Sequence, residues 1–108
     1  MTARSVNVVV PHTLGIAVAK DRVLTMLRDH QHDDPHIVSG DFAWNESEHR
    51  FTTQLTAYGA GVLASARISD TLVHVTTDEI AGFWLAVVIG VGRANTVLAS
   101  MLTEALKP

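Results

Sequence analysis

The sequence has no cysteine, only 18% charged residues and no hydrophobic run long enough to span a bilayer. The lack of cysteine excludes disulfides, thiolate metal ligands and thiol nucleophiles, so packing alone must stabilise the fold. It also fits a reducing compartment, and we expect a cytoplasmic protein. The chain carries 11 acidic and 8 basic residues, with a net charge of −3, and lacks the basic surplus of a nucleic-acid-binding protein. We therefore expect no nucleic-acid partner.

The most apolar segment spans residues 81–92 and contains Gly82, Gly90 and Gly92. A transmembrane helix needs about 20 consecutive apolar residues, and this segment is shorter. The first residues pass directly into an alternating pattern, without the apolar segment and cleavage site of a signal peptide. We expect neither a membrane-spanning segment nor export. The 108 residues, 47% of them hydrophobic, predict one domain over residues 1–108.

The amino-terminal part predicts a strand followed by a helix. Valines alternate along residues 6–10, and Pro11 then removes a ladder donor, which predicts a short edge strand that ends there. Thr13 is a candidate N-cap for a helix that runs to about residue 29. The positions that share its apolar face are Ile16, Lys20, Val23, Leu24 and Leu27. The polar segment 30–35, which ends on a proline, predicts a loop.

From residue 37 onward the hydrophobic pattern alternates, and turn residues recur about every ten positions, which is typical of an antiparallel meander. The strands expected here cover residues 38–44, 51–58, 62–68 and 71–77. The turns expected between them lie at residues 45–48, 59–61 and 69–70.

Asp78 is a candidate N-cap for a final helix over about residues 79–106. Gly90 and Gly92 each cost about 1 kcal/mol relative to alanine inside a helix, so we expect a kink or break there. The resulting order is β-α-β-β-β-β-α. It predicts an α+β fold in which two helices cover a mainly antiparallel sheet of four to five strands.

The sequence offers no convincing catalytic or metal site. His30, His32 and His36 lie close together, but histidines two positions apart do not share a helix face, so a solvated loop is favoured over a metal site. No Gly-x-Ser-x-Gly motif is present, and no nucleophile lies beside a base. We therefore assign no catalytic residue, no metal ligand and no cofactor, and we expect the protein not to be an enzyme.

The final helix has more apolar positions than one core-facing stripe can use. Phe83, Leu85 and Ile89 lie outside that stripe and form a candidate hydrophobic contact surface. Monomeric proteins seldom expose large apolar patches, so the surplus predicts a partner. A second copy of the chain is the default expectation, with a hydrophobic ligand or an apolar surface as alternatives.

Several short motifs together resemble a known family. They are His-Thr-Leu-Gly at residues 12–15, Phe-Ala-Trp at 42–44, Gly-Ala-Gly at 59–61, and a final helix that closes on Leu98, Leu102 and Leu106. In this order they resemble the small polyhydroxyalkanoate-system proteins of bacteria, which are about this long and are associated with storage granules. The resemblance covers nearly the whole chain and implies an accessory, non-enzymatic role.

If that resemblance holds, Phe83, Leu85 and Ile89 would adsorb to the polyester granule surface or to other granule proteins. One alternative is a small helix-grip-like protein that binds a hydrophobic ligand, with room left by Ala64 and Ala66. Trp44, Phe51 and Trp84 would then line a cavity, whereas in the competing interpretation the same side chains fill it. The other alternative is a dimeric structural protein.

Overall fold

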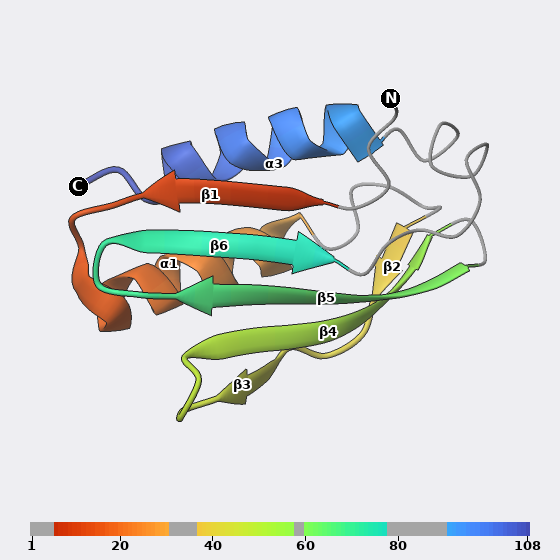
Figure 1. Cartoon of the computed structure of the whole chain (residues 1–108), viewed down its shortest axis with the longest axis horizontal. Helices are drawn as coiled ribbons and strands as arrows, with labels where there is room; N and C mark the ends of the chain where they lie inside the picture. Colours follow the sequence, from red (N-terminus) through yellow and green to blue (C-terminus); the bar gives the residue numbers. More distant parts are fainter. Residues whose placement is uncertain (1–5, 31–36, 58–59, 78–90) are drawn as a thin grey trace.

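Two helices cover one face of an antiparallel sheet in the computed structural model, which describes residues 6–30, 37–57, 60–77 and 91–108 (Figure 1). In chain order the elements are β1 (Asn7–Pro11), α1 (Gly15–Asp29), β2 (Ile37–Ser39), β3 (Ala43–Asn45), β4 (Arg50–Ala57), β5 (Ala60–Ile68), β6 (Leu72–Thr77) and α3 (Val91–Ala105). This arrangement confirms the predicted α+β fold and its order, with β2 and β3 together in the place of one predicted strand. Of the described helices, neither is long and apolar enough to cross a membrane.

The described strands form one sheet in the order β1-β6-β5-β4-β2, and β3 also pairs with β4. Every pairing in it is antiparallel. β1 forms an edge, as predicted, and Pro11 pairs with Leu72 at its end. α3 lies against β1, where the Asn7 N–H donates a hydrogen bond of 2.9 Å to Asn95 Oδ1. A side chain of the helix thus accepts a hydrogen bond from one of the backbone N–H groups that an edge strand leaves unpaired.

The strand predicted over residues 38–44 is not continuous, because a bulge divides it into β2 and β3. Ser39 pairs with Leu55 and Ala43 pairs with Thr52. Four steps along this edge, from 39 to 43, therefore lie opposite three steps along β4, from 52 to 55. One extra residue on one strand is the definition of a β-bulge, which bends the strand that carries it.

The hydrogen bonds at the junction between β1 and α1 come from a histidine and not from the predicted threonine cap. Leu14 occupies the N-cap position of α1 without a side-chain cap, so the prediction for Thr13 is wrong. Instead, the Leu14 N–H donates to His12 Nδ1 at 3.1 Å, and His12 Nε2 donates to the Ser69 carbonyl at 2.9 Å. The next residue, Gly15, has a φ of +78°, which an L side chain rarely adopts. His12 is only 7% exposed, so these bonds lie inside the protein.

The turn predicted at residues 59–61 overlaps a strand in the structure. β4 and β5 remain paired as far as Ala57 and Ala60, so Ala60 and Gly61 belong to β5. A Cβ at Gly61 would lie 3.1 Å from Gln54 Nε2, so glycine allows this close pairing. The residues that connect the two strands, 58–59, lie outside the described ranges.

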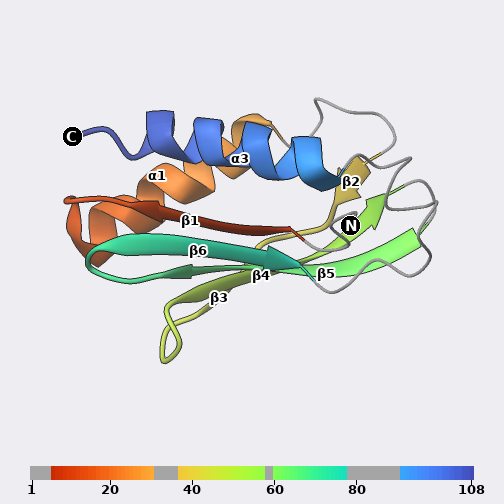
Figure 2. The same ribbon diagram turned by 45° about the horizontal axis from the view of Figure 1, so that its top comes forward.

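The core lies between the inner face of the sheet and the two helices, which lie side by side on that face (Figure 2). The strands contribute Val8, Val10, Phe51, Ala66, Ile68, Val73 and Val75. The helices and the turn after α3 contribute Ala19, Val23, Met26, Leu102 and Leu106. Within α1, Val23 was expected on the apolar face, whereas the burial of Ala19 and Met26 was not. The expected face is partly buried at Ile16, Leu24 and Leu27.

The final helix is described only in its second half. α3 runs from Val91 to Ala105, where the prediction had a helix over about 79–106. Leu98, Leu102 and Leu106 face the core, Leu102 most completely at 0% exposed. Residues 79–90, and with them Gly90 of the predicted break, lie outside the described residues, whereas Gly92 lies in the first turn of α3.

Candidate ligand-binding cavity

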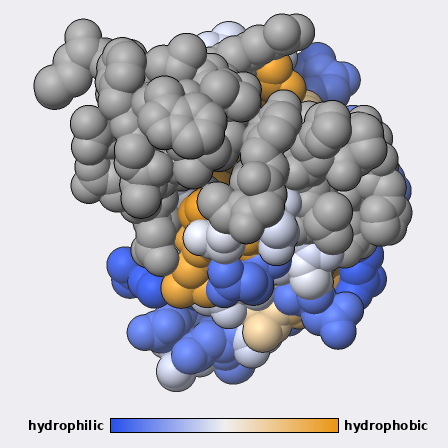
Figure 3. Space-filling view, turned by 90° about the vertical axis from the view of Figure 1, so that its right-hand side faces the viewer, coloured by the Kyte–Doolittle hydropathy of each residue, from blue (hydrophilic) through white to orange (hydrophobic). Residues whose placement is uncertain are grey.

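A cavity of about 370 Å³ lies between the inner face of the sheet and the two helices. It sits beside the last turn of α1, the middle of α3, the end of β6 and the place where β2 pairs with β4. Figure 3 views the molecule from its side nearest these ends and shows hydrophobic residues that reach the surface there. Val97 of α3, which lines the cavity, is 46% exposed. The cavity is thus only partly enclosed, and α3 brings one of its wall residues to the protein surface.

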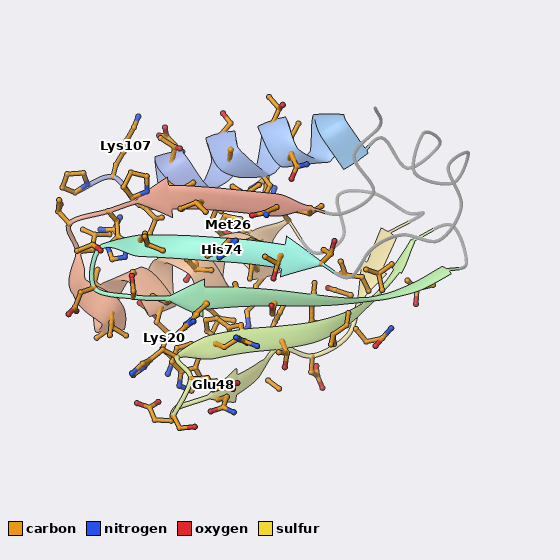
Figure 4. The ribbon with its side chains drawn as sticks, viewed as in Figure 1. Lys20, Met26, Glu48, His74 and Lys107 are labelled. Atoms are coloured by element: carbon orange, nitrogen blue, oxygen red, sulfur yellow. The ribbon has the colours of Figure 1, made fainter. Side chains whose placement is uncertain are left out.

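The walls of the cavity are mainly apolar. The sheet contributes Phe51, Leu55, Ala64, Ala66 and Val75. The helices contribute Met26, Leu27, Val97, Leu98 and Met101. Figure 4 labels Met26, which comes from α1 behind the sheet. Phe42, from the bulge between β2 and β3, completes this wall. Met26 and Met101 come from different helices, and their flexible thioether chains adapt to occupants of different shape.

Two threonines on the inner face bring hydroxyl groups to the cavity, and the backbone already engages both. Thr53 Oγ1 donates to the Gly40 carbonyl at 3.2 Å. Thr77 Oγ1 accepts from the Val6 N–H at 2.9 Å, which leaves its own hydrogen available for donation. Among the described residues that line the cavity there is no lysine, arginine, aspartate or glutamate. Thr77 can thus offer a hydroxyl donor in a mainly apolar setting.

The cavity arises from small side chains on β5. Ala64 pairs with Thr53 on β4 and with Thr77 on β6, so three side chains of modest volume lie in one row beneath the helices. Four residues further along β5, Ile68 pairs with Val73, and both are buried. The volume of the side chains along β5 thus determines where the sheet and the helices pack tightly and where a cavity remains between them.

The aromatic residues that the sequence grouped as a cavity lining take different places relative to the cavity. Phe51 lines the cavity, whereas Trp44 is not among the described residues that do. Instead the Trp44 ring packs on Phe51, with 4.7 Å between ring centroids, and Lys20 Nζ lies 4.3 Å from the Trp44 ring centroid. Trp44 therefore supports Phe51 from outside the cavity. Trp84, the third residue of the group, lies outside the described residues.

The predicted contact surface of Phe83, Leu85 and Ile89 also lies outside the described residues. Within the described ranges, no three histidine, cysteine or carboxylate side chains come together as a metal-ligand group. His30 lines the cavity from the end of α1, while His32 and His36 fall outside the described part of the chain.

Sequence reasoning identified part of the cavity wall and missed part. The small residues Ala64 and Ala66, and the aromatic Phe51, were recognised from the alternation of the strands. Met26 was missed, although it lies three residues after Val23 on the same helix face.

No family model, no curated protein and no solved structure matches this chain.

Proposed function

We propose that this is a non-enzymatic binding protein that holds a small, largely apolar molecule in the cavity between sheet and helices. The observation that carries the proposal is a cavity of about 370 Å³ with mainly apolar walls. Ligand sites typically measure about 300–1,000 Å³ and combine apolar walls with a few placed polar groups. The cavity meets both criteria, with the Thr77 hydroxyl as a polar group.

The wall chemistry favours an acyl chain with one polar group. Each methylene that leaves water contributes about 0.8 kcal/mol, so a chain of several carbons gains enough to bind. The Thr77 hydroxyl can donate to a hydroxyl or carbonyl oxygen of such a chain. Since no described lysine or arginine lines the cavity, a carboxylate end would remain at the open side, near solvent.

Hydroxyacyl compounds fit this description, and the resemblance to polyhydroxyalkanoate-system proteins supports them as the natural class. In this proposal the accessory role in storage is to bind hydroxyacyl units. Adsorption to granules and homodimer formation remain predictions that depend on Phe83, Leu85 and Ile89.

Displacement of a hydrophobic dye tests the proposal. The purified protein is titrated with a dye whose emission rises in apolar surroundings, and the bound dye is then displaced with a medium-chain fatty acid or its 3-hydroxy derivative. We expect one saturable site, displacement by both compounds, and no displacement by acetate at the same concentration. Absence of saturable dye binding, or equal displacement by acetate, would refute the proposal.

A further inference from the structure

The face of the sheet opposite the helices, here called the open face, carries a row of basic side chains. Arg50 on β4 pairs with Arg67 on β5, and Arg67 pairs with His74 on β6. Side chains alternate along a strand, and the neighbours of these three residues in sequence include Phe51, Ile68 and Val73, which are buried against the helices. The row of Arg50, Arg67 and His74, named the basic row, therefore lies on the open face; Figure 4 labels His74 near the middle of β6.

The two arginines of the basic row lack acidic partners. Within the described part of the chain, neither guanidinium group forms an ion pair or a hydrogen bond, and Arg50 Nε is buried without an acceptor. Glu48 and Asp70 are close in sequence but make no ion pair with them. Like charges directly opposite on neighbouring strands destabilise a sheet. In a protein with a net charge of −3, this arrangement needs an explanation.

The row beside the basic row is polar, while Val9 on β1, which pairs with His74, is apolar and exposed. The next row of the open face is Thr52, Ser65 and Thr76, in which the Ser65 and Thr76 hydroxyls lie 3.0 Å apart. His74 Nε2 lies 2.8 Å from Asn7 Oδ1. None of these strand positions carries a carboxylate, so the polar groups next to the basic row add no negative charge of their own.

We propose that the basic row binds a phosphate group on the open face of the sheet. The guanidinium fork matches the oxygens of phosphate, and two adjacent forks supply two positive charges for a dianion. A carboxylate carries only one negative charge, so it would neutralise only one of the two arginine charges, whereas a phosphate dianion would neutralise both. A second copy of the chain fits less well, because a two-fold axis near the basic row would place the same arginines against each other.

NMR of the side-chain Nε–Hε groups of arginine tests this proposal on the intact chain. Inorganic phosphate is titrated at constant ionic strength, because salt alone screens surface charges. We expect saturable shifts at Arg50 and Arg67, and no comparable shift for Arg28, which is exposed on α1. Arg67→Gln is expected to weaken phosphate binding by about tenfold or more, since one charge-assisted interaction is lost.

Arg28→Gln is the matched control and is expected to bind phosphate like the unmodified protein. The backbone spectrum shows in the same experiment that each variant is folded. Shifts that rise linearly without saturation, equal affinity for acetate, or an equal loss in Arg28→Gln would each overturn the phosphate site. Because the basic row and the cavity lie on opposite faces of the sheet, dye displacement is expected to be unchanged in Arg67→Gln, so this site and the proposed function fail independently.

Discussion

The two ends of the same sheet differ in how completely the helices close over it. At one end, Ile68 and Val73 pair beneath the helices, Leu102 is fully buried, and His12 links the start of α1 to the β5–β6 turn. At the other end, Ala64 lies between Thr53 and Thr77, and a cavity of about 370 Å³ remains. The difference teaches that one arrangement of sheet and helices can contain both a packed core and a binding site. The volume of the side chains along β5 determines which of the two forms at each end.

Truncation of two α3 side chains, one beneath each end of this comparison, is expected to give the largest effect. Leu102→Ala removes a side chain that is 0% exposed at the closed end, and we expect it to lower the free energy of unfolding by about 2–5 kcal/mol. Leu98→Ala, one turn away, borders the cavity and is only partly buried, so we expect a clearly smaller loss. Urea denaturation measures both. Equal losses would contradict the difference between the two ends.

The histidine link at the closed end gives a smaller expected effect. His12→Ala removes the acceptor of the Leu14 N–H and the donor to the Ser69 carbonyl, and we expect a loss of about 1–3 kcal/mol in the free energy of unfolding. Thr13→Ala is the matched control, with an expected change within about 0.5 kcal/mol, because Thr13 does not cap α1. Thermal or urea unfolding checks the pair. A Thr13→Ala loss as large as that of His12→Ala would restore threonine as the cap.

The fold could be predicted from the sequence largely because strand periodicity and turn spacing are local signals. The valines of β1, the proline at its end and the alternation along β5 are examples of the signals that indicated the class and the order of elements. The bulge between β2 and β3 was missed, because one extra residue is visible only against the register of β4. The role of His12 was missed for a similar reason, since its partner Ser69 lies 57 positions away.

The cavity was only partly predictable. Small residues on β5 indicated room, but whether Trp44 and Phe51 fill it depends on how they pack together. The structure shows the Trp44 ring in tilted contact with Phe51, with Lys20 Nζ over it, and Trp44 is not among the described residues that line the cavity. The basic row was not anticipated at all, because the pairing of Arg50 with Arg67 requires the register of β4 and β5.

The central claim is that the cavity is the binding site. The most direct test compares dye binding by two alanine-to-leucine variants. Ala64→Leu adds a branched side chain inside the cavity, and Ala17→Leu adds the same side chain on the exposed surface of α1. The account predicts that Ala64→Leu remains folded and loses saturable dye binding, while Ala17→Leu binds like the unmodified protein. Undiminished binding in folded Ala64→Leu would contradict the account.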